Sequence, residues 1–165
     1  MKKFILCLSV IILTICLTGC MGKTERFEGK GVSIVLPSDF EVVETEKWDF
    51  YVENDEVAIM SNRLGRWTSI EDANGNKISL SILPLKTYYE MVLTAYKLEV
   101  DTYFVEGYRS TFYYCYYTVG EDYGYMMMVA ATEGYFYTIN LCVDYDVFQE
   151  SKQQLLEYAI SIELE

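Results

Sequence analysis

Three consecutive runs rich in Tyr, Val, Met and Phe limit the fold of this chain more than any other feature of its 165 residues. The runs cover about residues 108–119, 124–132 and 135–143, and the segments GEDYG and TEG link them. Aromatic and β-branched runs separated by short Gly-containing links are typical of consecutive antiparallel strands. We therefore predict that these runs form a three-stranded meander within an antiparallel sheet.

The tyrosines of this stretch can be assigned to faces of the predicted sheet. Successive residues of a strand point to opposite faces, so we expect Tyr114 and Tyr116 to share one face. Tyr113 and Tyr117 then share the other, and aromatic side chains on both faces favour a sheet that is covered on both sides. The alternative is an exposed aromatic platform for a sugar, a peptide or a partner protein. The candidate ligand-binding residues of such a platform are Tyr114, Tyr116, Tyr125 and Tyr137.

The rest of the chain predicts shorter strands and two helices. Strands bounded by turn residues are expected at 31–37, 40–44, 48–52, 57–60 and 78–83. Residues 61–73 have no regular pattern, and we expect them to be irregular. Apolar residues recur with a helical period over residues 85–99 and again over 148–160. Helices beside a mostly antiparallel sheet make an α+β fold, and we predict one such domain over residues 31–165.

The N-terminus has the pattern of an export signal. The basic start MKK precedes an apolar stretch, residues 4–17, which is shorter than the roughly 20 residues needed to span a bilayer. Residues 17–20, LTGC, resemble the lipobox of bacterial lipoprotein signal peptides. This resemblance implies that Cys20 is fatty-acylated and becomes the new N-terminus after removal of residues 1–19, the lipoprotein signal peptide. An uncleaved anchor or an ordinary secretory signal is the alternative.

Removal of the signal peptide would change the charge and the attachment of the protein. The net charge of −12 would fall to −14, because Lys2 and Lys3 leave while all 25 acidic residues stay. Two acyl chains on Cys20 give stable anchoring, here on the extracytoplasmic face of the cell membrane, and residues 20–30 would form a polar tether. The Lys-, Ile-, Tyr- and Glu-rich, Pro-poor composition favours a Gram-positive source. The acidic excess disfavours binding to nucleic acid, which requires a basic surface.

Residues that usually carry catalysis or bind metals are scarce in this chain. It has no His, the most usual general base and the commonest metal ligand at neutral pH. No G-x-S-x-G motif or Gly-rich phosphate loop is present. Residues 72–76, DANGN, begin like a calcium loop, but its twelfth position is Leu83 instead of Glu. We therefore predict no catalytic residues, no metal site and no cofactor.

Two cysteines stay in the domain once the signal peptide is removed. Cys115 and Cys142 both lie in predicted strands, and the turns between them place a third strand between theirs. Because bridged cysteines need Cα atoms within about 7 Å, we expect two buried free thiols. A disulfide, which an exported compartment permits, is the alternative.

The order of elements resembles the PsbP-like superfamily, which includes the extrinsic photosystem II subunit, a yeast Ran-binding factor and many small bacterial lipoproteins. The segments that carry the resemblance are GVSIVLP at 31–37 with Phe40, the helix at 85–99, VEGY at 105–108, GYFYTI at 134–139 and AISI at 159–162. The resemblance covers nearly all of the predicted domain, and residues 61–76 fit it least well. It implies a sheet covered by helices and an accessory or binding role instead of catalysis.

The anchor and the resemblance together give two expectations about function. The first is a membrane-anchored, non-catalytic binding or accessory module of the cell envelope, with a protein of the envelope as its partner. The alternative is a solute- or glycan-binding lipoprotein that uses the tyrosine-rich face.

Overall fold

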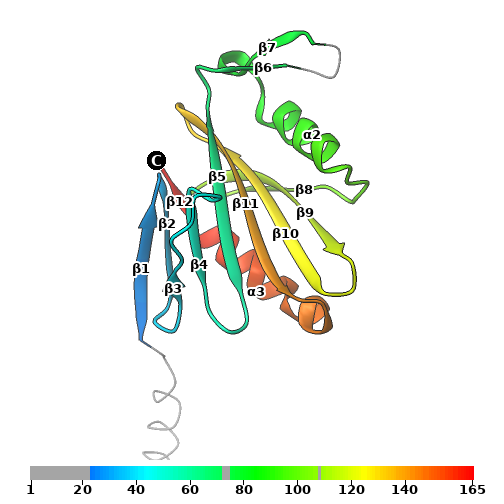
Figure 1. Cartoon of the computed structure of the whole chain (residues 1–165). Coiled ribbons are helices and arrows are strands. Elements are labelled where there is room, and N and C mark those ends of the chain that lie inside the picture. Colours follow the sequence, from blue (N-terminus) through cyan, green and yellow to red (C-terminus); the bar gives the residue numbers. More distant parts are fainter. Residues whose placement is uncertain (1–22, 72–74, 108) are drawn as a thin grey trace, which may run out of the picture.

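The computed structural model describes residues 23–71, 75–107 and 109–165. In this part of the chain, a seven-stranded sheet with the order β3-β4-β5-β11-β10-β9-β8 forms the centre of the domain (Figure 1). All neighbouring strands in it are antiparallel. The strands are β3 (Glu41–Val42), β4 (Phe50–Glu53), β5 (Ala58–Gly65), β8 (Tyr103–Glu106), β9 (Thr111–Val119), β10 (Tyr123–Ala131) and β11 (Tyr135–Asp144). The predicted α+β class with a mostly antiparallel sheet is confirmed.

Strands β9, β10 and β11 form the predicted meander. The β9–β10 turn holds Gly120 at a φ of 64°, a conformation that glycine adopts without steric cost. β11 then pairs with β5, which comes much earlier in the chain. The sequence pattern did not predict β8, because its Tyr103 and Phe104 are both exposed and give no alternation of buried and exposed residues.

The expectation of a polar tether over residues 20–30 is wrong from residue 24 onward. β1 (Thr24–Gly29) pairs with β2 (Val32–Pro37), and β12 (Glu163–Leu164) completes a three-stranded sheet. Lys30 and Gly31, both with positive φ, make the tight turn between β1 and β2. Phe27 is the one apolar side chain in β1 and it is buried, so a strand forms where the composition suggests a linker. The predicted signal peptide and Cys20 lie outside the described residues.

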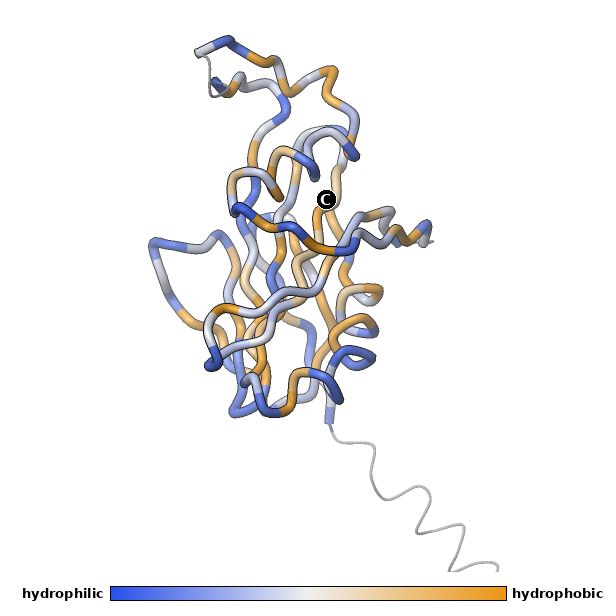
Figure 2. Tube along the Cα trace, turned by 90° about the vertical axis from the view of Figure 1, so that its right-hand side faces the viewer, coloured by the Kyte–Doolittle hydropathy of each residue, from blue (hydrophilic) through white to orange (hydrophobic). Residues whose placement is uncertain are grey.

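Helices cover both faces of the seven-stranded sheet (Figure 1). α3 (Phe148–Ser161) packs on one face and α2 (Leu85–Tyr96) on the other; short 3₁₀ turns, η1 (Leu80–Ile82) and η2 (Tyr145–Val147), precede them. The two faces alternate along each strand, so that Met126 points to α3 and Met127 to α2. The prediction that aromatic side chains fill a core on both sides of the sheet is confirmed for most of them. Turns at the ends of the strands are largely hydrophilic (Figure 2).

The segment expected to be irregular, residues 61–73, contains regular structure. β5 continues to Gly65, and β6 (Ser69–Glu71) pairs with β7 (Lys77–Ser79) in a hairpin beside α2 (Figure 1). The hydrophobic pattern stops before the end of β5, because Asn62 and Arg63 are polar side chains that lie half-buried in the strand. The predicted strand at 78–83 is β7 followed by η1. Among the described residues, no helix combines the length and the apolar character needed to cross a membrane.

Candidate binding cleft

Helix α2 covers only part of its face of the sheet. It packs through Tyr88 on Phe136 and through Tyr89 on Tyr113, with ring centroids 4.1 and 5.4 Å apart, and it ends at Tyr96. Toward the β9–β10 turn, none of the described helices lies over this face (Figure 1). A cleft of about 920 Å³ opens there, which is the size of a small-molecule site.

Five aromatic side chains line this cavity, which we call the aromatic cleft. They come from the segment 43–48, from the central strands and from the end of α2. The aromatic residues are Trp48, Tyr51, Tyr96, Tyr117 and Tyr125. The polar residues are Glu44, Thr45, Lys47, Thr118 and Asn140.

The register of the sheet places these side chains in rows across the strands. One row runs from Tyr117 through Tyr125 to Cys142 and Ala58. The rings of Tyr117 and Tyr125 stack, with centroids 5.0 Å apart and planes inclined by 12°. The next row contains Asn140, Met60 and Tyr51. Large rings therefore stand on both sides of a strip of smaller side chains on β11 and β5.

Three phenol groups of the cleft have raised pKa values and are uncharged at neutral pH. The Tyr117 hydroxyl donates a hydrogen bond to Oδ1 of Asn140 at 3.2 Å, and the Tyr51 hydroxyl donates one to the Glu53 carboxylate. That hydrogen bond raises the pKa of Tyr51 to about 12. Burial raises the pKa of Tyr125 to about 12 and raises the pKa of Tyr117 as well. All three groups are therefore neutral and contribute shape and hydrogen bonds instead of charge.

The segment 43–48 forms the wall of the cleft opposite Tyr125. The backbone N–H of Val43 donates to the carbonyl of Tyr51 at 2.9 Å, which extends the sheet pairing into the segment. The ammonium of Lys47 lies over the ring of Trp48, 5.0 Å from its centroid, a distance at which a cation is attracted by an indole ring. Lys47 is the one basic side chain among the described residues that line the cleft.

The four tyrosines proposed from the sequence as a platform do not share a face. Tyr114, Tyr116 and Tyr137 lie on the α3 side, where Tyr114 is 8% exposed and Tyr137 is fully buried. Tyr125 lies on the α2 side, because the turn at 120–122 pairs it with Tyr117. The prediction that these four tyrosines form one platform is therefore wrong. The turn GEDYG contained the information needed to place Tyr117 beside Tyr125, whereas Trp48 and Asn140 come from distant segments and gave no such signal.

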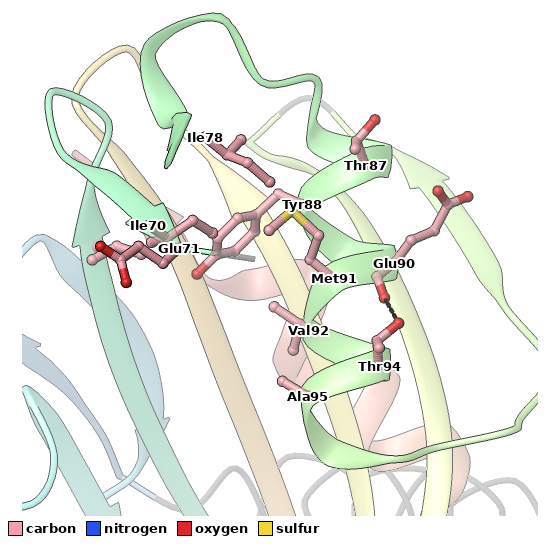
Figure 3. Close-up of a pocket in the computed structure, with 11 residues that line it drawn as sticks. Ile70, Glu71, Ile78, Thr87, Tyr88, Glu90, Met91, Val92, Thr94 and Ala95 are labelled. Atoms are coloured by element: carbon pink, nitrogen blue, oxygen red, sulfur yellow. Dashed lines mark hydrogen bonds between the residues drawn. The ribbon is translucent and has the colours of Figure 1, made fainter. Parts of the chain in front are cut away.

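A second concavity lies on the same side of the sheet, between α2 and the β6–β7 hairpin. This groove has a volume of about 590 Å³, and Figure 3 shows Ile70, Tyr88 and Met91 pointing toward one another in it. Its acidic side chains are Glu71 and Glu90. It has a more apolar lining than the aromatic cleft and fewer groups that could orient a ligand.

Metal-ligating side chains and free thiols were the remaining candidates for chemistry among the described residues. Among them, no group of three or more His, Cys, Asp or Glu side chains is placed to hold a metal ion. Cys115 and Cys142 are buried free thiols with β10 between their strands, as predicted. Burial raises the pKa of both thiols, so they are poor nucleophiles at neutral pH. Residues 72–74 of the calcium-like segment lie outside the described residues.

Comparison with known proteins identifies similar structures but no similar sequences. No protein-family model matches the chain, and no curated protein matches its sequence. The structure is similar to the solution structure of cyanobacterial PsbP (CyanoP) from Synechocystis sp. PCC 6803, with a TM-score of 0.58 and 14% identity over 89% of this chain and 96% of that one. A crystal structure from Bacteroides thetaiotaomicron VPI-5482 gives a TM-score of 0.52 and 14% identity over 87% of this chain and 48% of that one, about half its length. LpqN, involved in cell envelope biogenesis of Mycobacterium tuberculosis, gives a TM-score of 0.40 and 9% identity over 86% of this chain and 90% of that one.

Proposed function

We propose that the chain, which has a PsbP-like fold, is a lipid-anchored binding module on the extracytoplasmic side of a bacterial cell membrane. The aromatic cleft is its binding site for a component of the cell envelope. The observation that supports this proposal most directly is the set of aromatic rings on the part of the sheet that α2 leaves uncovered. Concave, mostly apolar surfaces with a few placed polar groups are typical of ligand sites.

A binding role agrees with the chemistry of the described residues better than a catalytic role. The phenols of Tyr51, Tyr117 and Tyr125 stay protonated and the thiols are buried. The chain has no His to act as a general base near neutral pH. We therefore propose that the domain recognises its partner by shape and hydrogen bonding and is not an enzyme.

The proposed anchor would hold the domain close to the membrane. From Cys20 to Thr24, the first residue of β1, the chain extends at most roughly 14 Å. The end of the domain where β1 begins also carries the β4–β5 and β9–β10 turns (Figure 1). Acidic side chains at this end are Asp39, Asp55, Glu56, Glu121 and Asp122. Their repulsion from anionic headgroups would keep the body of the domain off the lipid surface and leave the cleft accessible.

Metabolic labelling tests the anchor. Cells that express the protein are grown with an alkyne fatty acid, and we expect the wild-type chain to carry the label and Cys20→Ala to lose it. Cys16→Ala, which changes a cysteine inside the predicted signal peptide, is the matched control and should keep the label. Undiminished labelling of Cys20→Ala would contradict the proposed anchor.

Photo-crosslinking in living cells tests the cleft. A benzoylphenylalanine residue at Val119, which is exposed, lines the cleft and lies on the same face of β9 as Tyr117, should form a reproducible adduct with an envelope component. The same residue at Val35, which is exposed on β2, is the control position. We expect the Val119 adduct to disappear when Trp48→Ala and Tyr125→Ala are combined. Equal adducts at both positions, or an adduct that survives the double substitution, would show that the cleft is not the binding site.

A further inference from the structure

We infer that the ligand of the aromatic cleft is an uncharged saccharide, an inference that rests on the proposed binding function of this cleft. Three features of the cleft lead to it. One tyrosine ring has a face that no neighbour in its row covers, hydrogen-bonding groups surround that space, and the pattern of charges disfavours both anions and cations.

Tyr125 offers one face of its ring to a ligand. Its other face stacks on Tyr117 at a centroid distance of 5.0 Å. On the other side, the next two positions of the row are Cys142 and Ala58. The Cys142 thiol is hydrogen-bonded to the Tyr125 hydroxyl, but both side chains are too small to cover a tyrosine ring. A pyranose ring has C–H groups on its faces and hydroxyls around its edge, so it packs flat against an aromatic ring while its edge stays free to hydrogen-bond.

The opposite side of the cleft supplies a second aromatic wall. Tyr51 lies on β4, and two strands, β11 and β5, separate it from β10. A saccharide that lies over Asn140 and Met60 would thus contact Tyr125 on one side and Tyr51 with Trp48 on the other. The cleft volume of about 920 Å³ is large enough for more than one sugar ring.

Neutral hydrogen-bonding groups border this space. Asn140 uses its Oδ1 to accept the Tyr117 hydroxyl, which leaves its Nδ2 as a donor. The hydroxyl of Thr45 both donates and accepts, and the Glu44 carboxylate accepts. Hydroxyls at the edge of a sugar need this mixture of donors and acceptors, which an apolar peptide or an acyl chain would leave unpaired.

The charges around the cleft select against charged ligands. The chain has a net charge of −12, so an anion such as a phosphate polymer is repelled at long range, and Lys47 is the one described basic group in the lining that could bind it. The same net charge and Glu44 attract a cation at long range, but the Lys47 ammonium already lies 5.0 Å from the centroid of the Trp48 ring and repels a second positive charge from it. An uncharged ligand is repelled neither by the net charge of the chain nor by Lys47.

The two tryptophans of the chain allow a direct test. Trp48 lines the cleft, whereas Trp67 is 68% exposed and packs on Tyr135 away from it. In Trp67→Phe, Trp48 is the only tryptophan, and its fluorescence reports occupation of the cleft. In Trp48→Phe, Trp67 is the only tryptophan, and its fluorescence should not change on titration. The full-length lipidated protein is used in a polyoxyethylene detergent, which carries neither a sugar nor a charge.

Four probes distinguish the possible ligand classes. Trp67→Phe is titrated with the N-acetylglucosamine tetramer, maltotetraose, a galacturonic acid tetramer and choline. We expect saturable binding of at least one neutral tetramer, and affinities at least tenfold weaker for the anionic tetramer and for choline. Tyr125→Ala should weaken binding of the neutral tetramer about tenfold, the equivalent of 1.4 kcal/mol. Tyr145→Ala, which changes an exposed tyrosine outside the cleft, should leave the affinity unchanged.

The results separate this inference from the proposed function. If neither neutral tetramer binds, or if choline or the anionic tetramer binds more tightly, the inference is overturned. If that happens while the Val119 crosslink in cells still depends on Trp48 and Tyr125, the cleft is a binding site for another class of ligand and the proposed function stands. If the crosslink fails as well, both are overturned.

Discussion

The two faces of the seven-stranded sheet differ in how completely they are covered. On the α3 side, Ile139 and Leu141 of the sheet and Leu155 of the helix are fully buried. On the α2 side, the helix leaves the aromatic cleft at one end and the apolar groove beside the β6–β7 hairpin. Both faces carry aromatic and methionine residues, so composition does not distinguish them. The position of the helix distinguishes them, because α2 covers a core of its own but leaves part of its side of the sheet open.

Truncation of one side chain on each face should give the largest difference in the free energy of unfolding between the two faces. Leu155→Ala removes a fully buried leucine from the α3 side, and we expect a loss of about 3 kcal/mol in the free energy of unfolding. Met91→Ala removes a half-buried methionine that lines the groove, and we expect about 1 kcal/mol. Urea denaturation of both variants measures the difference. Equal losses would mean that the α2 side stabilises the fold as much as the α3 side does.

Gly124 tests how closely α3 approaches the sheet. A Cβ added at this position would lie 2.1 Å from Cγ of Phe148 at the start of α3, so Gly124→Ala forces the helix and the strand apart. We expect a loss of about 2 kcal/mol in the free energy of unfolding. Gly134→Ala, where the nearest atom of another residue is 3.8 Å away, is the control and should change stability by about 0.5 kcal/mol or less. If Phe148→Ala fails to relieve the cost of Gly124→Ala, the close approach is not its cause.

Alkaline pH should affect the buried phenols on both faces. The pKa of Tyr125 on the α2 side and that of Tyr116 on the α3 side are each raised by burial to about 12. In the unfolded chain a phenol titrates near pH 10, so the folded state holds these protons more tightly. The contribution of each phenol to stability is therefore fully present below about pH 10 and is lost as the pH rises toward about 12.

Urea denaturation across this pH range measures that loss, and absorbance at 295 nm follows phenolate formation. Tyr125→Phe and Tyr116→Phe should each reduce the dependence of stability on pH, because each removes one of the shifted groups. Tyr145→Phe, at an exposed position, is the matched control. A pH dependence that is the same in Tyr125→Phe as in the wild-type chain would contradict the placement of this phenol in a partly desolvated cleft.

The elements predicted correctly are those with a strong repeating pattern. The PsbP-like fold, the meander and α2 could be predicted because their apolar residues recur with a period of two or of 3.6 over many residues. β1 was missed because a strand at the border of the domain needs only one buried side chain, here Phe27. β8 was missed because its exposed residues leave no periodic signal.

The site was harder to predict than the fold because it depends on register and on contacts between distant segments. Alternation along one strand assigned Tyr114 and Tyr116 to the same face correctly. Pairing across the β9–β10 turn, which decides that Tyr125 faces the other way beside Tyr117, depends on the turn and not on either strand alone. Trp48 and Asn140 line the same cleft only because β11 returns to pair with β5, and no pattern within either segment indicates this.

Substitution of Lys47 should have the smallest effect on stability, but it should change which ligands the aromatic cleft on the α2 side prefers. Lys47 is exposed, and its contact with the ring of Trp48 is a surface cation–π pair, so Lys47→Gln should change the free energy of unfolding by about 0.5 kcal/mol.

Without the ammonium, the Trp48 ring becomes available to another cation. In the Trp67→Phe background, we therefore expect Lys47→Gln to bind choline more tightly and to bind the neutral tetramer as before. Lys86→Gln, on the solvent side of α2, should change neither affinity. If choline binding does not increase in Lys47→Gln, the charge of Lys47 does not set the preference of the cleft, and its shape must exclude the cation instead.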